Sequence, residues 1–378
     1  MEPRQNRDTV AVTDLGAYRE NLAKILRYIG PKVLLMAVVK ANAYGHGMIE
    51  CSKTALRAGA SMLGVAYARE GITLREEGIT APILVMASES DEYIPAYLEY
   101  DLTVGLSSFA AIEALRKHLK PETPACRVHI KVDTGMGRVG LLPAEVPRAL
   151  EMIKNTPGIT AEGIFTHFPS ADEAEHEDFC REQIRIFTGL LNDLTAKGLR
   201  PPLAHMCNSA GTLKFPEAHL DLVRTGLMSY GLIPYTGSEK WFPLKPVLSW
   251  KSRVAFIKEV PAGFTVSYSR TFSTARPSRL ATVPVGYADG YRRFLSNRGM
   301  AVINGVKVPV AGRVCMDQTV FDITDAGDVR VGDPVTLIGR DGAASVTVED
   351  HAAIGGTISH EIVTGITGRV SRAFIQNS

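Results

Sequence analysis

The sequence has 378 residues, too many for one ordinary hydrophobic core, and predicts two domains or a barrel with an added module. Apolar residues make up 45% and charged residues 22%, and a formal net charge of +2 gives no electrostatic basis for binding nucleic acid or an anionic membrane. The five cysteines form no Cys-x-x-Cys pair, and no apolar run resembles a secretory signal or the ~20 residues of a membrane span, so we expect a cytoplasmic protein without disulfides or a bound metal.

The first two thirds of the chain alternate between short apolar runs and segments with helical spacing. A short strand is predicted at 9–12 and a helix at 13–29. Strands that alternate with helices are typical of parallel βαβ units, and eight such strands favour a closed (β/α)8 TIM-like barrel over an open sheet. We therefore predict an α/β barrel over residues 1–244, with its strands at 33–39, 62–66, 82–86, 102–106, 126–132, 159–165, 203–208 and 220–224.

The pattern changes near residue 245, where β-rich runs and turn signals replace the helical periodicity. Asn304-Gly305 lies between two alternating apolar arms, which is a strong hairpin signal. Two short helices are expected within 345–356 and 359–367. Residues 245–378 therefore predict a separate, mainly β C-terminal domain.

Polar residues follow several of the predicted barrel strands. In a (β/α)8 barrel the active site forms at the carboxyl ends of the strands. Any one of these residues is more simply a solvated strand end, but together on one rim they indicate a site. They are Lys40 and Tyr44 after the first strand, Lys131 and Arg138 after the fifth, His167 after the sixth, Asn208 and Ser209 after the seventh, and Arg224, Gly226 and Leu227 after the eighth.

Lys40 is the most informative of these residues because it ends an otherwise apolar strand. A lysine, with an ordinary pKa of ~10.4, becomes a nucleophile when it is desolvated or placed near other cations, here Arg138 and Arg224. Such a lysine forms Schiff bases with carbonyl compounds, and pyridoxal phosphate is the leading carbonyl cofactor. A phosphate group needs hydroxyl and N–H donors after the seventh and eighth strands, and Ser209 and the turn at 225–227 offer them.

Eight segments, in order along the chain, resemble the signature segments of bacterial alanine racemases, which are fold-type III pyridoxal-phosphate enzymes. The resemblance implies an enzyme that interconverts L- and D-alanine, works as a homodimer with shared active sites, and supplies D-alanine for cell-wall synthesis or serves catabolism. The segments are AVVKANAYGHG, KVDTGMGRVG, GIFTHF, CNSAG, VRTGLMSYG, VSYSRTF, PVGYADGYRR and GRVCMDQ, from residue 37 to about 320.

The same resemblance implies roles for individual residues. Lys40 would carry the cofactor and act as the base on one face of the substrate, and Tyr268 of the second subunit would be the base on the opposite face. Arg138 would bind the substrate carboxylate, and Arg224, oriented by His167, would hydrogen-bond the pyridine nitrogen. The remaining roles are phosphate binding by Tyr44, Asn208, Ser209, Gly226 and Leu227, shaping of the substrate entry by Tyr287 and Met316, and a position carbamylated in some relatives at Lys131.

The C-terminal segment TISHE departs from the family pattern. The family usually has a tyrosine where this chain has His360, at a position that reaches the phosphate and helps to wall the side-chain pocket. Related racemases that act on serine have a smaller polar group at this wall. We therefore keep a serine or broader-specificity racemase as an alternative to an alanine racemase.

Other classes of protein compete with this interpretation. The segment GMGRVG at 135–140 matches a dinucleotide-binding fingerprint, but Pro143 and Pro147 disturb the helix that should follow it. A fold-type III decarboxylase would carry a different cysteine motif, with an additional acidic residue, in place of GRVCMD. A non-catalytic pyridoxal-phosphate-binding barrel would lack a second domain. His46, His118, His129, His205 and His219 have no metal-ligand spacing and are expected to be core or solvated histidines.

Overall fold

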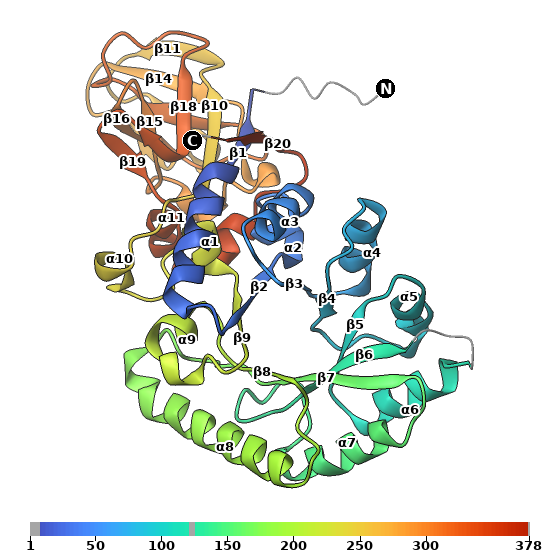
Figure 1. Cartoon of the computed structure of the whole chain (residues 1–378). Helices are drawn as coiled ribbons and strands as arrows, with labels where there is room; N and C mark the ends of the chain where they lie inside the picture. The colour runs from blue at the N-terminus through green and yellow to red at the C-terminus, as the bar shows by residue number, and fades with distance from the viewer. Residues whose placement is uncertain (1–7, 121–124, 377–378) are drawn as a thin grey trace. The chain divides into compact units, whose positions relative to one another are not determined.

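The computed structural model describes residues 8–120 and 125–376 (Figure 1). The chain divides into two compact units, which we describe separately. The barrel unit contains residues 18–43 and 48–245, and the C-terminal unit contains the residues up to 17, 44–47 and those from 246 on.

The barrel unit is built on a parallel sheet with the strand order β8-β7-β6-β5-β4-β3-β2-β9, in which eight strands lie within the described residues. Two backbone hydrogen bonds link its ends, from Asp221 N to Ala204 O and from Arg224 N to Cys207 O, so the sheet is nearly closed. The prediction of a TIM-like barrel from the apolar runs is confirmed. Its strands are β2 (Leu34–Val38), β3 (Met62–Val65), β4 (Ile83–Val85), β5 (Thr103–Leu106), β6 (Cys126–Lys131), β7 (Ile159–Phe165), β8 (Leu203–His205) and β9 (Leu222–Thr225).

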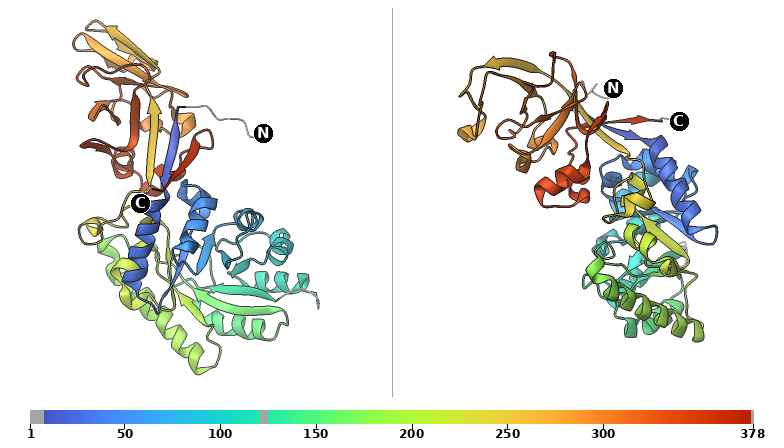
Figure 2. Two further views of the ribbon diagram at one scale, coloured as in Figure 1. Left: turned by 45° about the horizontal axis from the view of Figure 1, so that its top comes forward. Right: turned by 90° about the vertical axis from the view of Figure 1, so that its left-hand side faces the viewer.

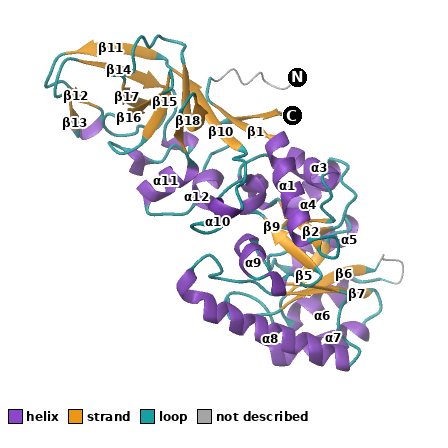
Figure 3. Ribbon diagram, turned by 60° about the vertical axis from the view of Figure 1, so that its left-hand side comes forward, coloured by secondary structure: helices purple, strands orange, loops and turns teal. Residues whose placement is uncertain are grey.

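Helices cover the outside of this sheet, with α6, α7 and α8 along β6 and β7 (Figures 1 and 3). In both views of Figure 2 the long yellow-green α8 lies outside the strands. The predicted helix at 13–29 begins at Leu15 instead, because Thr13 and Asp14 continue the preceding strand. The helices are α1 (Leu15–Ile29), α2 (Lys40–Tyr44), α3 (Met48–Arg57), α4 (Ala68–Glu76), α5 (Ile94–Glu99), α6 (Phe109–His118), α7 (Val146–Lys154), α8 (Glu177–Ala196), α9 (Ser209–Lys214) and α10 (Ser238–Trp241).

The interior of the barrel has an apolar side and a polar side. The apolar side is a buried cluster of Met36, Met62, Leu84 and Leu222. On the polar side, His129 of β6 contacts His205 of β8, with 2.8 Å between Nδ1 and Nε2. Because β7 lies between these two strands, the contact crosses the concave interior of the sheet.

The C-terminal unit is mainly β, as predicted. Its largest sheet has the order β16-β15-β18-β10-β1-β20, with β19 paired to β18; β11, β14 and β17 form a second sheet, and β12 pairs with β13. The bounds are β1 (Val10–Asp14), β10 (Leu248–Arg253), β11 (Phe256–Val260), β12 (Thr265–Val266), β13 (Phe272–Ser273), β14 (Ser278–Val283), β15 (Met300–Ile303), β16 (Val306–Pro309), β17 (Thr319–Asp322), β18 (Pro334–Asp341), β19 (Ala344–Val346), β20 (Ser371–Ile375), α11 (Val348–Gly355) and α12 (Ser359–Thr364).

Local signals in this unit correspond to the observed elements. Asn304 and Gly305 join β15 to β16, and both have left-handed backbone, with φ of 51° and 74°. Two successive positive φ values are what a two-residue hairpin turn requires. The two predicted short helices are α11 and α12. The strand β1 pairs with β10 on one side and with β20 on the other, so it belongs to this unit.

A buried histidine in α11 predicts a loss of stability in acid. His351 is 2% exposed, its ring lies 5.7 Å from that of Tyr291, and its Nε2 has no hydrogen-bond partner among the described residues. Burial lowers the pKa of His351 from its ordinary 6.5 to about 4. Below pH 6.5 the unfolded chain therefore takes up a proton that the folded chain does not, and stability falls as the pH falls towards 4.

We expect this one group to remove up to about 3 kcal/mol from the free energy of unfolding between pH 6.5 and 4. Urea unfolding of the native protein and of His351→Phe across this range measures the contribution, because phenylalanine keeps the ring but does not titrate. His176→Gln, at an exposed histidine, is the control and should follow the native protein. Equal pH slopes for the native protein and His351→Phe would contradict the prediction.

Candidate active site

Lys40 lies two residues beyond β2 and is the first residue of α2, whose backbone is not that of an ordinary α-helix. The next residues, Ala41, Asn42, Ala43 and Tyr44, all have φ between 52° and 55°, in the left-handed region. This conformation costs roughly 1–2 kcal/mol for each residue with a Cβ, so it must be held by other contacts. In the barrel unit the Asn42 side chain accepts a hydrogen bond from Met48 N at 2.9 Å.

Glu70, near the start of α4, which follows β3, contacts the left-handed segment 41–44. Its carboxylate accepts a hydrogen bond from Ala41 N at 2.6 Å and another from Ala66 N, just after β3, at 2.8 Å. The backbone that carries Lys40 is thereby attached to the neighbouring strand end. A carboxylate that accepts backbone N–H groups makes stronger hydrogen bonds than a neutral acceptor does.

The surroundings of Lys40 favour a neutral amine. Burial lowers the pKa of Lys40, and the guanidinium groups of Arg138 and Arg224 lower it further, while the Glu70 carboxylate opposes them. A neutral amine is both a nucleophile and a proton acceptor. The strand end therefore presents a lysine that can attack a carbonyl carbon or remove a proton.

Arg224, on β9, is buried and is held by several acceptors. Its Nη1 donates to His205 Nδ1 at 2.9 Å, and its Nη2 donates to Thr166 O at 2.9 Å, to His167 Nδ1 at 3.1 Å and to Met206 O at 3.1 Å. Burial lowers the pKa of Arg224 to about 10. Burial and the Arg224 charge also lower the pKa of His167 well below its ordinary range, so this imidazole is a neutral acceptor.

The last residue of β6, Lys131, and the exposed Arg138 of the loop that follows bring a second lysine and an arginine to the same rim. Burial, with the Arg224 and Arg138 charges, lowers the pKa of Lys131 well below its ordinary range. No helix begins within 135–140; the next helical elements are a 3-10 turn (Pro143–Glu145) and α7, which starts at Val146. The dinucleotide-binding interpretation of GMGRVG is therefore wrong, because no helix N-terminus lies there to face a pyrophosphate.

The ends of β8 and β9 form an anion-binding arrangement around Ser209. The Oγ of Ser209 accepts hydrogen bonds from Gly226 N at 3.2 Å and Met228 N at 3.3 Å, so its own hydrogen is left to donate. Asn208 is the N-cap of α9: its Oδ1 accepts from Gly211 N at 2.9 Å. Asn208 thereby orients the turn that carries Ser209. Hydroxyl and backbone N–H donors together suit a phosphate group.

In the C-terminal unit, Tyr44 and His360 lie ring to ring, with their centroids 5.5 Å apart. Burial raises the pKa of Tyr44 to about 12, which keeps its hydroxyl protonated and able to donate. A Cβ on Gly45 would lie 2.3 Å from Val363 O of α12, and Gly45 has a φ of 82°, so only glycine fits between these segments. The close approach places the residue after Tyr44 against the helix that carries His360.

Three more of the predicted site residues form an exposed cluster in the C-terminal unit. Tyr268 lies in a 3-10 turn (Tyr268–Arg270) and is 69% exposed, Met316 is 52% exposed and Tyr287 is 38% exposed. Backbone hydrogen bonds at 3.0 Å join 287–288 to the carbonyls of Cys315 and Met316. Ser267 Oγ donates to Arg313 O at 2.6 Å, which ties the Tyr268 turn to the same segment.

Sequence reasoning missed four residues around the barrel rim and interior. Glu70 carries no clear capping signal in the sequence, because the residue three positions before it is Tyr67 and not one of the usual N-cap residues. His129 and His205 are core histidines, which agrees with the expectation, but their hydrogen bonds to each other and to Glu162 were not predicted. Arg127, His129 and Lys131 alternate along one strand, and this period of two was the available signal for a polar inward face.

Comparisons with known proteins agree over nearly the whole chain. Residues 13–234 match the N-terminal domain of alanine racemases and residues 247–374 match their C-terminal domain. The alanine racemase of Symbiobacterium thermophilum is 45% identical over 368 residues, 97% of each chain. That of Halothermothrix orenii is 42% identical over 99% of this chain and 98% of its own.

The chain belongs to the alanine racemase family.

Solved structures of the family agree with the fold. The Bacillus anthracis alanine racemase, determined with bound L-Ala-P, has a TM-score of 0.92 and 38% identity, covering 98% of this chain and 96% of its own. The E. faecalis alanine racemase also has a TM-score of 0.92, with 36% identity over 99% and 100% of the two chains. The family activity makes this chain an isomerase of the racemase class.

Among the described residues, no group of three or more His, Cys, Asp or Glu side chains is arranged to hold a metal ion. Within residues 8–120 and 125–376, none of the helices combines the length and apolarity needed to cross a bilayer.

Proposed function

We propose that this chain interconverts L-alanine and D-alanine with pyridoxal phosphate as its cofactor. The observation that carries the proposal is Lys40, a desolvated lysine at a strand end whose pKa is lowered by burial and by two arginines. When bound, pyridoxal phosphate supplies a conjugated ring that delocalises the electron pair left on the substrate α-carbon after proton removal. The chain's own residues bind and orient the cofactor and the substrate, and they exchange protons with the α-carbon.

The donor set of the barrel unit fits this cofactor. Lys40 offers a neutral amine for the carbonyl carbon, and the Ser209 hydroxyl, whose own hydrogen is left to donate, suits the phosphate. Arg224 keeps its Nε–H and one Nη1 hydrogen beyond the four bonds described above, and these suit a ring nitrogen that accepts. We also assign phosphate contacts to Asn208, Gly226, Leu227, Tyr44 and His360.

Racemisation requires proton exchange on both faces of the α-carbon, and we assign it to Lys40 and Tyr268. The Lys40 amine removes the α-proton from one enantiomer, and the Tyr268 hydroxyl donates a proton to the opposite face; the reverse reaction exchanges these tasks. The strong exposure of Tyr268, Tyr287 and Met316 in the C-terminal unit supports a homodimer in which this cluster faces the barrel of a second copy. Tyr287 and Met316 would then shape the substrate entry.

Lys131, the last residue of β6, and Arg138 in the loop after it complete the proposed substrate site. The exposed Arg138 guanidinium would bind the amino-acid carboxylate, which it can grip with two parallel hydrogen bonds. The lowered pKa of Lys131 supports carbamylation, because only a neutral amine attacks carbon dioxide. A carbamate at Lys131 would carry a negative charge that positions Arg138. We further propose that the enzyme is cytoplasmic and that its D-alanine enters peptidoglycan precursors or catabolism.

The decisive experiment uses the purified protein. We expect a yellow preparation, attachment of the cofactor to the Lys40 peptide after borohydride reduction, and loss of the circular dichroism of an L-alanine solution as D-alanine forms. A colourless protein that forms no D-alanine after pyridoxal phosphate is added would defeat the proposal. A yellow protein that releases carbon dioxide from an amino acid would be a decarboxylase, and one that leaves alanine unchanged would be a cofactor-binding barrel.

His360 supports a second candidate, a racemase with unusual tolerance for serine. The imidazole is shorter and more polar than the tyrosine usual in the family, and it lies beside Tyr44. We expect His360→Tyr to raise the ratio of kcat/KM for L-alanine over L-serine by roughly tenfold, because the added bulk and lost polarity disfavour the larger hydroxymethyl group. His176→Tyr, at an exposed histidine, should leave the ratio unchanged. An unchanged ratio in His360→Tyr would remove this idea.

A further inference from the structure

Arg224 is a buried cation whose hydrogen-bond acceptors, in the described part of the chain, include no carboxylate. Its partners are two imidazole nitrogens and two backbone carbonyls. A buried charge is normally balanced by an opposite charge nearby. Following the hydrogen bonds outward from Arg224 leads to one carboxylate, that of Glu162, through His205 and His129.

The direction of this chain of hydrogen bonds follows from Arg224 alone. A guanidinium can only donate, so His205 Nδ1 accepts and the single proton of this neutral ring lies on Nε2. That Nε2–H must donate to His129 Nδ1, at 2.8 Å, so the proton of His129 lies on its own Nε2. This second Nε2–H donates to Glu162 Oε2 at 3.1 Å. Each ring is therefore held in one tautomer.

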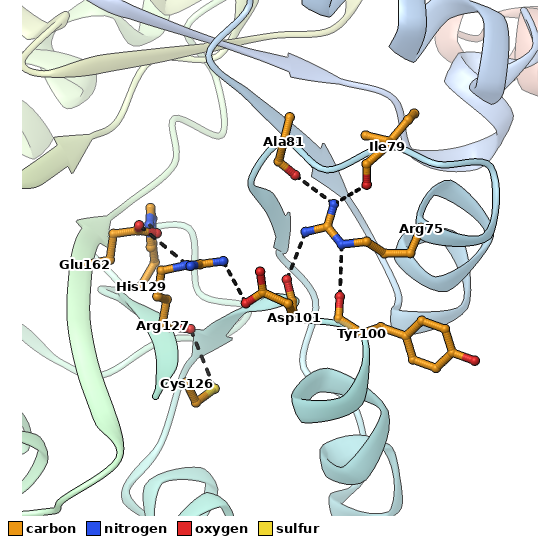
Figure 4. Close-up of polar contacts among 9 residues, drawn as sticks. All are labelled: Arg75, Ile79, Ala81, Tyr100, Asp101, Cys126, Arg127, His129 and Glu162. Carbon is orange, nitrogen blue, oxygen red and sulfur yellow. Dashed lines mark hydrogen bonds and ion pairs between the residues drawn. The ribbon is translucent and has the colours of Figure 1, made fainter. Parts of the chain in front are cut away.

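Glu162 ends the chain of hydrogen bonds in a group of charged residues (Figure 4). Arg127 lies between Glu162, at 3.8 Å, and Asp101, at 2.8 Å. The hydrogen bond from His129 is the main cause that lowers the pKa of Glu162, so the carboxylate is ionised. Arg75 donates to the carbonyls of Tyr100 and Asp101 and also to those of Ile79 and Ala81, so it ties the Asp101 loop to the segment between α4 and β4.

Strand β7 has a glycine where it passes the hydrogen-bonded histidines. A Cβ on Gly163 would lie 2.5 Å from His129 Nδ1, so only glycine leaves room for the ring. His129 and His205 are completely buried. The interior of a (β/α)8 barrel is usually filled by Val, Ile and Leu, and a polar column through it costs desolvation that an apolar core avoids.

We propose that Glu162, His129 and His205 are positioning residues that present Arg224, fixed in orientation and charge, to the ring of the cofactor. This inference rests on the proposed function, because it assigns the purpose of the arrangement to that site. The negative charge of the Glu162 carboxylate polarises the imidazoles of His129 and His205. This makes His205 Nδ1 a stronger acceptor for the Arg224 guanidinium. We call these three hydrogen-bonded residues the Glu162–His129–His205 relay. The relay affects the reaction only through Arg224.

The first test removes the charge and keeps the geometry. Glu162→Gln still accepts from His129 through its amide oxygen, and we expect kcat for alanine to fall about tenfold while KM changes less than twofold, since a hydrogen bond to a charged acceptor becomes one to a neutral acceptor. Asp101→Asn removes the charge of the other carboxylate beside Arg127 without touching the relay and should retain native kcat. Equal losses in the two variants, or native kcat in Glu162→Gln, would overturn the proposal.

The second test does not depend on catalysis. In the purified protein labelled with 15N-histidine, NMR should show both His129 and His205 with protonated Nε2 and unprotonated Nδ1; His129→Gln and His205→Gln assign the signals. In Glu162→Gln the Nε2–H proton of His205 should move upfield, although His205 does not touch Glu162. An unmoved His205 signal would overturn the relay. If the shift occurs in a protein without racemase activity, the proposed function fails and the relay remains only a structural feature.

A third variant displaces the relay without changing a polar group. Gly163→Ala places a methyl group against the His129 ring and should reproduce both the fall in kcat and the His205 shift. Gly189→Ala is the matched control, because a Cβ there meets no atom within 4 Å. If Gly163→Ala folds with native kcat and a native His205 signal, the proposal is wrong. If it fails to fold, the Glu162→Gln result decides.

Discussion

Replacing Lys40 by alanine should lower kcat for alanine racemisation by roughly 10⁴-fold or more, because the proposed mechanism gives this one amine both the binding of the cofactor carbonyl and the exchange of the α-proton. The physical basis is the burial and the two neighbouring arginines that lower the pKa of Lys40 and leave a reactive neutral amine. Circular dichroism of L-alanine solutions gives the rate, and borohydride reduction followed by peptide mass analysis should find no cofactor at this position.

The control for this prediction is Lys53→Ala. Lys53 is a partly exposed lysine of α3 paired with Glu77 at 3.3 Å, and its loss should change kcat by less than twofold. Far-UV circular dichroism checks that both variants fold. A Lys40→Ala enzyme with more than a tenth of the native rate would show that another group carries the cofactor and the proton.

Replacing Tyr268 by phenylalanine should lower the racemisation rate by about 10²–10⁴-fold, because in the proposed mechanism one of the two faces of the α-carbon then loses its proton donor and acceptor. In the proposed mechanism Lys40 still exchanges protons on its own face. In deuterated water, NMR should therefore show α-hydrogen exchange in one enantiomer of alanine without inversion. Tyr93→Phe is the control at another exposed tyrosine and should racemise at the native rate. Equal exchange of both enantiomers by Tyr268→Phe would contradict the assignment.

The two variants together test whether the active site is shared between subunits. A heterodimer of Lys40→Ala and Tyr268→Phe chains has one site with both bases and one site with neither. Co-expression should therefore restore about a quarter of native activity, since half of a random mixture is heterodimer and each heterodimer has one of two sites intact. If heterodimers form but racemase activity is not restored, both bases of each active site come from the same chain.

Much of the architecture was predictable from local patterns. Buried parallel strands are continuous apolar runs, so the eight barrel strands were visible as such between helical segments. Asn304 and Gly305 specified their turn because few other pairs adopt two left-handed residues in succession. Lys40 was visible because a lysine at the end of an apolar strand is chemically out of place.

The rim of the barrel was only partly predictable. That Lys40, Lys131, Arg138, His167 and Arg224 gather followed from the rule that parallel strands end on one side of a barrel. The role of Glu70 did not follow, because it depends on a left-handed backbone at 41–44 that two alanines do not favour locally. The assignment of Tyr268 came from resemblance and not from any property of the tyrosine itself.

The sequence by itself determined the periodic features of this protein: the barrel strands, the change to a β domain and the reactive residues at strand ends. Each depends on side-chain spacing over a few residues, where backbone geometry is regular. Only the tertiary structure decided which distant residues meet, such as β1 with β20 across more than 350 residues and His129 with His205 across 76. Those contacts depend on how the whole chain closes the barrel and sheets, and single-sequence patterns carry no signal for such closure.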